Sequence, residues 1–321
     1  MALQRASREI LRFRCSSSFP GPFFKTSSSP SFCHLYFRNP RHRCHYPMCV
    51  IDFRRWNHGG IRTLCSACSR VVGIVRSPDL VDLEYADLNL SRKVSAEVGH
   101  IRIRQHVNPL SSAFSVPSEV PEWNLVFNDP TLPLVVDIGC GSGRFILWLA
   151  KRHSSLKNYL GLEIRQKLVK RANFWVKELA LHNTYFLFAN ATVSLQQLLS
   201  SYPGPLVSVF ILCPDPHFKR RHKKRRVVQE PVVYTIVNYL TTGGQVFVQS
   251  DVLEVALDMR NQFDALSDLQ HMDAVDCSTS YNCDEDGWLL RNPLGIRTER
   301  EIHAELEGAK IYRRMYQKAP R

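Results

Sequence analysis

One stretch of the sequence, residues 135–145, joins an apolar run to an acid and three glycines in the order Val-Val-Asp-Ile-Gly-Cys-Gly-Ser-Gly-Arg-Phe. Gly139, Gly141 and Gly143 allow a tight turn between a strand and a helix, and they let a ligand approach main-chain N–H groups. Asp137 places a carboxylate beside that turn. The spacing is Gly-x-Gly-x-Gly, whereas dinucleotide sites use Gly-x-Gly-x-x-Gly. The stretch predicts a small-ligand site; the alternative is a tight strand–helix turn without a ligand.

Two further polar residues stand at the ends of apolar runs. Glu163 ends the run 159–163, and a carboxylate there can accept both hydroxyls of a ribose because it offers two acceptor oxygens. Asn190, followed by Ala191, ends the next run, where its amide could read an adenine edge. Together with Asp137, these residues predict an adenosyl ligand at the ends of three strands.

A basic segment follows the next apolar run. Asp215 stands between two prolines, which stiffen the loop and hold its carboxylate at the edge of the predicted ligand. Residues 219–226 are seven lysines or arginines and His222. Such runs are often solvated faces or localisation signals, but this one adjoins the predicted ligand site. We interpret it as a phosphate-binding segment that brings a nucleic acid to the reactive centre.

Two short pieces complete the set of candidate residues. Asp251 follows the fifth apolar run and should point into the same crevice. Thr298, Glu299, Arg300 and Glu301 open the last helix with a capping-box pattern, so Thr298 and Glu301 have a plain alternative interpretation as a helix N-cap.

The elements that must position these residues alternate along the chain. Apolar, β-rich runs predict strands at 134–138, 159–163, 184–189, 206–213 and 245–249, and amphipathic stretches predict helices at about 143–153, 166–182, 193–200, 229–240 and 252–266. This alternation predicts an α/β fold with a doubly wound, mainly parallel sheet, which binds ligands at the carboxyl ends of its strands. Residues 309–316 suit an antiparallel strand closing the sheet. Three tryptophans are expected in the core: Trp123, Trp148 and Trp175.

Charge divides the chain into segments. Its formal net charge is +13, and the first 76 residues carry 13 lysines and arginines against two acids. Arg- and Ser-rich composition with few acids is typical of an organellar transit peptide, and the Ser content and length favour a chloroplast over a mitochondrion or dual targeting. The alternative is a disordered basic arm that binds nucleic acid. We expect a leader at 1–76, an N-terminal extension at 77–130 that is extended with little core of its own, and a catalytic domain at 131–321.

Cysteine usage and hydropathy narrow the possibilities further. Six of the ten cysteines lie in residues 1–76, and Cys65-Ser-Ala-Cys68 has no second pair at zinc-site spacing, so no metal is expected. The other four fit reduced thiols: Cys140, Cys213, Cys277 and Cys283. No window holds 18 consecutive apolar residues, so we expect no membrane-spanning helix.

Residues from about 100 to 316 resemble the TrmB-type tRNA (guanine-N7-)-methyltransferases of the bacterial kind, whose fold is the Rossmann-like class I S-adenosylmethionine-dependent methyltransferase fold. The resemblance depends on these motifs: Arg104-Gln-His106-Val-Asn108-Pro109, the Asp137–Gly143 loop, Gly161-Leu-Glu163, Asn190-Ala191, Pro214-Asp215-Pro216-His-Phe-Lys219 with Lys224-Arg225-Arg226, and Thr298-Glu299-Arg300-Glu301. The Pro-Asp-Pro block is the most specific of them.

The resemblance implies methyl transfer from S-adenosylmethionine to N7 of a variable-loop guanosine of tRNA, conventionally the forty-sixth nucleotide. It implies a catalytic role for Asp215, which also borders the cofactor. Cofactor contacts are implied for Asp137, Gly139, Gly141, Gly143, Glu163, Asn190 and Ala191. Substrate contacts are implied for Lys219, Asp251, Thr298, Glu299, Arg300 and Glu301. A monomer or homodimer that needs no WD-repeat partner is expected.

Two other function classes stay open at this point. An NAD-dependent oxidoreductase also uses a glycine loop and an acid after the second strand, but it explains neither the Pro-Asp-Pro block nor the basic run. A non-catalytic RNA-binding subunit would keep the fold for docking. Intact Asp137, Glu163 and Asp215 argue against that class.

Overall fold

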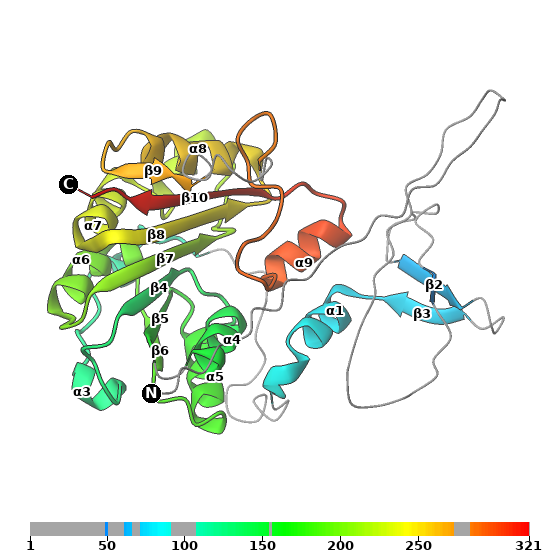
Figure 1. Ribbon diagram of the computed structural model, residues 1–321, viewed down its shortest axis with the longest axis horizontal. Coiled ribbons are helices and arrows are strands. Elements are labelled where there is room, and N and C mark those ends of the chain that lie inside the picture. The colour runs from blue at the N-terminus through cyan, green and yellow to red at the C-terminus, as the bar shows by residue number, and fades with distance from the viewer. Residues whose placement is uncertain are drawn as a thin grey trace, which may run out of the picture. The chain divides into compact units, whose positions relative to one another are not determined.

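The computed structural model describes residues 49–50, 61–65, 71–90, 107–153, 156–272 and 283–320. Its centre is a seven-stranded sheet with the strand order β6-β5-β4-β7-β8-β10-β9 (Figure 1). The strands from β6 to β8 in that order are parallel, and β10 runs antiparallel to both of its neighbours. The bounds are β4 Leu134–Ile138, β5 Asn158–Glu163, β6 Thr184–Phe188, β7 Leu206–Leu212, β8 Leu240–Ser250, β9 Leu269–His271 and β10 Tyr312–Lys318.

The predicted doubly wound sheet with an antiparallel C-terminal strand is therefore confirmed. The five predicted parallel strands all form, and β8 begins five residues earlier than the predicted 245–249. Short β9 has no counterpart among the predicted elements, because three residues are too few to show a hydrophobic period.

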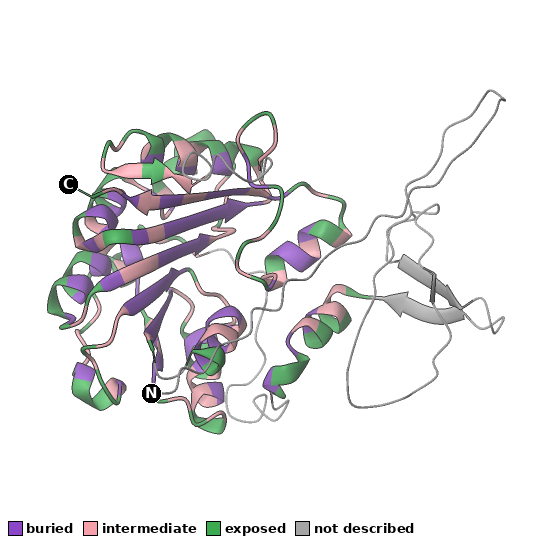
Figure 2. Cartoon of the chain, in the orientation of Figure 1, coloured by how far each residue is buried: buried purple, intermediate pink, exposed green. Residues whose placement is uncertain are grey.

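Helices cover both faces of the sheet. Leu134, Val136 and Ile138 of β4 share one hydrophobic core with residues of α6, α7 and α8, while Val135 belongs to a second core with residues of α4, α5 and α9. This alternation explains why the central strands are buried along their length (Figure 2). The helix bounds are α4 Arg144–Arg152, α5 Gln166–Glu178, α6 Ala191–Ser201, α7 Glu230–Tyr239, α8 Leu253–Asp264 and α9 Glu299–Leu306.

The segment before β4 contributes to both cores. It contains α1 (Ser77–Glu84), the 3₁₀ helices η1 (Ala86–Leu88) and η2 (Ser112–Phe114), and α3 (Trp123–Val126). Tyr85 packs in the core of the α4 side and donates its hydroxyl to the Arg297 carbonyl over 2.6 Å. The expectation of an extended chain is thus wrong for residues 77–88. These residues form helices, and their buried side packs against elements that are distant in the sequence. Trp123 and Trp175 are buried as predicted, and Trp148 is half-buried under the Arg152 guanidinium.

Within the predicted leader, the described residues form an antiparallel three-stranded sheet of β1 (Cys49–Val50), β2 (Ile61–Cys65) and β3 (Val71–Val75). Residues 1–48, Cys68, the motif residues Arg104–His106 and Cys277 lie outside the described residues. Cys140, Cys213 and Cys283 carry free thiols. Of the helices that the structure describes, none has the length and apolar character needed to cross a bilayer.

Candidate functional site

Most of the predicted site residues follow the ends of five neighbouring parallel strands. Asp137 is the penultimate residue of β4, Glu163 is the last of β5, and Asn190 lies two residues beyond β6. Asp215 and Asp251 come shortly after β7 and β8. These strands end on the side of the sheet that carries α9 (Figure 1), which we name the carboxyl edge. The sheet therefore gathers five predicted residues at one edge, as doubly wound sheets do at their ligand sites.

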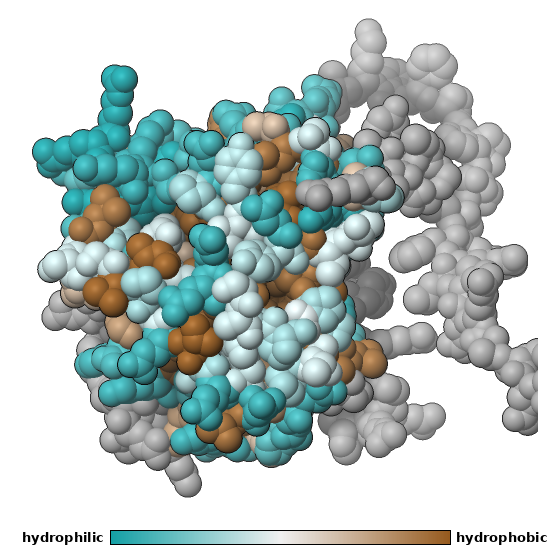
Figure 3. Space-filling model, turned by 90° about the vertical axis from the view of Figure 1, so that its left-hand side faces the viewer, coloured by the Kyte–Doolittle hydropathy of each residue, from teal (hydrophilic) through white to brown (hydrophobic). Residues whose placement is uncertain are grey.

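The opposite ends of the strands point toward another face of the molecule. It shows apolar residues in separate patches among hydrophilic ones (Figure 3).

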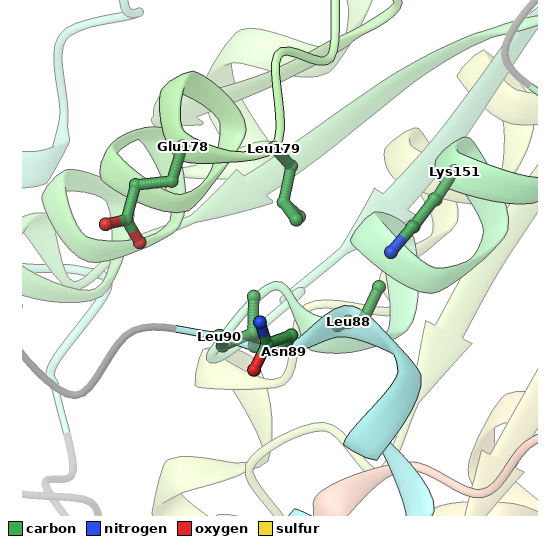
Figure 4. A pocket seen from close by; sticks show the side chains of 6 residues that line it. All are labelled: Leu88, Asn89, Leu90, Lys151, Glu178 and Leu179. Carbon is green, nitrogen blue, oxygen red and sulfur yellow. The ribbon is translucent and has the colours of Figure 1, made fainter.

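A hollow of about 320 Å³ lies at the C-terminal ends of α4 and α5 (Figure 4). It is remote from the glycine loop, because that loop leads into the N-terminus of α4. It is lined by Leu88, Asn89, Leu90, Lys151, Glu178 and Leu179. This hollow is separate from the candidate site.

The loop after β4 is shaped by its backbone. Gly139 and Cys140 donate their N–H groups to the Leu162 carbonyl over 2.8 and 3.1 Å. Gly139 has a φ of +81°, and an added Cβ there would meet no described atom within 4 Å. At Gly143, an added Cβ would lie only 2.7 Å from the Phe186 ring. The first glycine therefore faces open space that a ligand can occupy, whereas the last one lets the loop pack closely against the sheet.

Asp137 is a buried acid with an unmet hydrogen bond. The residue is 2% exposed, and its Oδ1 atom has no hydrogen-bond partner among the described residues. Burial, followed by the charge of Glu163, raises the pKa of Asp137 to about 8. A buried carboxyl group without a partner is costly, and a ligand ammonium group would supply both a donor and the opposite charge. The residue thus fits the amino-acid end of an adenosyl-amino-acid ligand such as S-adenosylmethionine.

Glu163 is also buried, but its carboxylate has partners. Its Oε2 accepts the Gly141 N–H over 2.9 Å, and its Oε1 accepts the backbone N–H and the Nε of Arg165, each over 2.9 Å. Burial acts to lower the pKa of Arg165, but the hydrogen bonds to Glu163 and the charges of Glu163 and Asp215 outweigh it and raise that pKa. Arg165 therefore stays charged and lies in the field of two predicted site acids, although no motif argument singled it out.

Asn190 has a structural role in addition to its predicted one. Its Oδ1 accepts the Thr192 N–H at the start of α6 over 3.2 Å, which is an N-cap. Its Nδ2 donates to the carbonyl oxygens of Pro109 and Phe114 over 3.1 and 3.0 Å. Buried Ala191 is the first residue of α6. The amide thus ties segment 109–114 to the site, and adenine recognition by Asn190 stays a prediction.

The loop after β7 is strained on both sides of Asp215. Cys213 and His217 have φ values of +52° and +44°, a left-handed conformation that residues other than glycine rarely adopt. The Cys213 N–H donates to the Gln249 carbonyl of β8 over 2.7 Å. Asp215 itself is exposed, and Phe218 is 66% exposed. Strain of this kind persists only where other contacts hold it, and it is concentrated at functional sites.

The basic run after this loop divides by exposure. It forms the 3₁₀ helix η3 (Arg220–Arg225). Five of its cationic residues are exposed: Lys219, Arg220, Arg221, Lys223 and Lys224. Arg225 is half-buried and Arg226 is buried. The exposed members present the positive surface that the sequence predicted, and the buried one does not contribute to it.

The start of α9 is a complete capping box, as its pattern suggests. Thr298 Oγ1 accepts the Glu301 N–H over 3.1 Å, and Glu301 Oε2 accepts the Thr298 N–H over 3.3 Å. The Glu301 carboxylate is fully buried, where it also accepts from Arg313 of β10 over 2.5 Å and from Gln249 over 3.0 Å. The plain N-cap interpretation thus describes both residues, and Glu301 holds α9 to two strands.

The first two residues of α9, Glu299 and Arg300, face the site. Glu299 Oε1 accepts the Ser142 hydroxyl of the glycine loop over 2.5 Å and also bonds to the Arg144 guanidinium. Arg300 Nη2 donates to Asp251 over 2.5 Å. The helix therefore joins the glycine loop to the end of β8. In the described part of the chain, no group of three or more His, Cys, Asp or Glu side chains could hold a metal ion.

Comparisons with known proteins agree with this geometry. A family model with the description "Putative methyltransferase" matches residues 131–314, more than half of the chain. The chain is 43% identical to a tRNA (guanine-N(7)-)-methyltransferase of Trichormus variabilis over 219 residues, covering 68% of this chain and 96% of that protein. It is 43% identical to that of Synechocystis sp. over 223 residues, covering 70% and 100%. The chain belongs to the tRNA (guanine-N7-)-methyltransferase family.

Membership in this methyltransferase family sets aside the oxidoreductase alternative. Two solved structures show a weak overall similarity to this chain at low identity. An rRNA methylase from Streptococcus thermophilus gives a TM-score of 0.38 at 12% identity and covers 59% of this chain and 89% of its own. TrmN from Thermus thermophilus gives a TM-score of 0.37 at 14% identity and covers 58% and 44%.

Sequence reasoning did not single out several residues that build the site of this methyltransferase-family chain. They are Ser142, Arg144, Arg165, Gln249 and Arg313, together with the buried role of Arg226. Ser142 lies inside the Asp137–Gly143 motif, so its position carried a signal, whereas Arg165 lies two residues beyond Gly161-Leu-Glu163. Gln249 and Arg313 meet Glu301 only through strand pairing between β8 and β10.

Proposed function

We propose that this protein transfers the methyl group of S-adenosylmethionine to N7 of a guanosine in tRNA, the variable-loop guanosine at nucleotide forty-six. The observation that carries the proposal is the 43% identity to tRNA (guanine-N(7)-)-methyltransferases over nearly their whole length. The arrangement of the carboxyl edge supports it, because an open glycine turn, a buried acid and an exposed acid lie beside a basic segment.

The chain's own residues divide the work. Asp137 and Glu163, with Gly139 and Gly141 and the end of β6, hold the methyl donor, whose sulfonium supplies an electrophilic methyl group when it is bound. Guanine N7 carries a lone pair and no proton, so no general base is needed. Methylation places a positive charge on the purine, and a carboxylate nearby stabilises that charge as it forms.

Asp215 is the residue that we assign to this role. Its carboxylate is exposed at the edge of the methyl-donor site. There it orients the guanine base through the hydrogen-bond donor groups of that base. Asp251 also helps to orient the base. Lys219, Thr298, Glu299, Arg300 and Glu301 belong to the guanosine side, where Lys219 faces solvent and Glu301 acts through the position of α9. The exposed lysines and arginines of η3 hold the tRNA phosphates.

The test is a methylation assay on the full chain with unmodified tRNA, followed by borohydride–aniline cleavage at 7-methylguanosine. We expect cleavage at the variable-loop guanosine with the wild type. With Asp215→Asn, we expect a rate loss of roughly 100-fold or more with donor binding retained. Asp87→Asn is the control, because Asp87 sits in an exposed ion pair with Arg152. Undiminished turnover by Asp215→Asn would overturn the residue assignment, and absence of any 7-methylguanosine would overturn the function.

The same proposal extends to location and assembly. Residues 1–76 direct the chain to the chloroplast, which the Arg- and Ser-rich, acid-poor composition and the cyanobacterial relatives support. Fusion of residues 1–76 to a fluorescent protein tests this, and signal in mitochondria instead would overturn it. We further propose a monomer or homodimer that works without a WD-repeat partner, so activity of the purified chain alone is the expected result.

A further inference from the structure

Arg226, the last residue of the basic run, has an environment unlike that of its neighbours. It is 3% exposed, whereas Lys223 and Lys224 in the same run are exposed. A guanidinium that cannot reach solvent cannot bind a phosphate on the surface of a tRNA. The charge of Arg226 must therefore have another use.

Its contacts show what that use is. The Nε atom donates to the carbonyl oxygen of Pro216 over 2.9 Å. The Nη1 and Nη2 atoms donate to Asp258 over 3.1 Å and to Glu254 over 3.0 Å, two carboxylates one turn apart on α8. One planar guanidinium thus joins the Pro-Asp-Pro loop to a helix, with each nitrogen bonded to a different residue.

The loop that Arg226 contacts is the strained loop around Asp215. Pro216 directly follows Asp215 and precedes His217, whose φ is +44°. Cys213, on the other side of Asp215, has a φ of +52°. Such conformations relax unless surrounding contacts fix them. Because Pro216 has no N–H group, its carbonyl is the polar backbone group through which the loop can be held at this residue.

From these contacts we infer that Arg226 is a positioning residue, which fixes the place of Asp215 by clamping the Pro216 carbonyl to α8. The exposed members of the run bind the tRNA phosphates. The inference deepens the proposed function and rests on it, since it assigns the run two separate tasks. Lysine cannot replace Arg226, because an ammonium group cannot direct donors to three separate acceptors in one plane.

The experiment compares Arg226→Ala and Arg226→Lys with Lys224→Ala, which removes the same charge from an exposed position of the run. We measure kcat, the tRNA dissociation constant at several salt concentrations, and donor affinity. Both Arg226 variants should lose roughly 100-fold in kcat, since a small misplacement costs about that much. Their tRNA affinity and salt slope should match the wild type. Free guanidinium should restore part of the rate of Arg226→Ala only.

Lys224→Ala should show the opposite split: tRNA affinity falls and the salt slope is reduced by roughly one, while kcat at saturating tRNA falls far less than in the Arg226 variants. If Arg226→Ala instead lowers the salt slope as Lys224→Ala does and keeps kcat, Arg226 is a phosphate contact and the inference is overturned. An inactive wild type would count against the proposed function alone, and hydrogen exchange then decides the clamp. Amides of residues 217–219 should exchange faster in Arg226→Ala than in Lys224→Ala, and equal exchange would overturn the inference.

A second variant covers a failure of Arg226→Ala to fold. Asp258 is about one third exposed, and Glu254 still pairs with the buried Arg226 guanidinium when Asp258 is removed, so Asp258→Ala is tolerable on the surface of α8. Removing one acid beside a basic surface should not weaken tRNA binding. If Asp258→Ala loses kcat while tRNA affinity is unchanged or higher, the clamp is supported; full kcat would overturn it.

Discussion

The loops after β4 and β7 leave neighbouring strands of one sheet, yet they are held in different ways. The glycine loop after β4 is held largely by main-chain bonds, such as those from Gly139 and Cys140 to the Leu162 carbonyl, and it also bonds to the side chains of Glu163 and Glu299. The loop after β7 is held largely by side chains, with Arg226 bonded to Pro216 and to α8. Helix α9 belongs to the second kind, since Glu301 and Arg313 fix it.

This difference has a physical consequence. Backbone bonds carry no net charge and respond little to salt or pH, so the glycine loop itself should be stiff and respond little to either. Ion pairs depend on partners from distant parts of the chain, and exposed pairs are screened by salt. The guanosine side should therefore be easier to disturb by a single substitution. Four predictions test this contrast, in order of decreasing effect.

The largest effect should come from Glu301 on the guanosine side. Glu301→Ala leaves the buried Arg313 guanidinium without its closest carboxylate, and breaking a buried pair in this way costs about 3–5 kcal/mol. Thermal and denaturant unfolding measure the loss. Glu307→Ala, at the C-cap of the same helix but exposed, is the control and should change stability by less than about 1 kcal/mol. Similar losses in the two variants would mean that Glu301 is not a structural carboxylate.

Asp137 should give the donor side its one clear dependence on pH. Its pKa is raised to about 8 in the folded protein, above the ordinary value of 3.8 that the unfolded chain keeps. Between those values the folded state holds a proton that the unfolded state has lost. Stability should therefore fall as pH rises from about 4 to about 8.

Denaturant unfolding at pH 5, 6, 7 and 8 tests this, with Asp137→Asn expected to flatten the slope. Donor binding at pH 7 should release a proton, because a ligand ammonium favours the ionised carboxylate. Calorimetry in buffers of different ionisation enthalpy would detect that release. An unchanged slope in Asp137→Asn would contradict the assignment of the raised pKa to this residue.

Substitutions of two glycines on the donor side should distinguish a loss of packing from a loss of ligand contact. At Gly161 an added Cβ would lie 2.4 Å from the Phe186 ring, so Gly161→Ala should cost about 1–3 kcal/mol in stability. At Gly139 it would meet no described atom, and the cost should be about 1–2 kcal/mol from its positive φ. Donor affinity should fall more in Gly139→Ala. The reverse order of affinities would show that the open space at Gly139 is not the donor cradle.

The smallest effect should come from Arg300, which is adjacent to Glu301 in sequence. Arg300 pairs with Asp251 while its side chain is 43% exposed. Arg300→Ala should change the free energy of unfolding by about 1 kcal/mol or less, and less at high salt. Denaturant unfolding in low and high salt is the measurement. A loss comparable to that of Glu301→Ala would mean that burial does not set the difference between these two neighbours.

Much of the fold could be predicted because its signals are local. A short apolar run predicts each parallel strand of the central sheet, and the glycines predict the turn after β4. Helix α1 and strand β9 escaped prediction. The buried Tyr85 beside α1 finds its partner at Arg297, more than 200 residues away, and β9 is three residues long. Neither element therefore shows a recognisable hydrophobic pattern within a short window of the sequence.

The sequence by itself determined the order of the parallel strands along the chain, the donor-side acids at their ends and the presence of a concentrated basic segment. These follow from periodicity and residue type over a few neighbouring positions. Only the tertiary structure decided which charges face outward. It buried Arg226 against α8 and Glu301 against β8 and β10, while Lys224 remained exposed. The reason is that burial of a charge depends on partners brought by other elements, and a run of like residues does not show which member they reach.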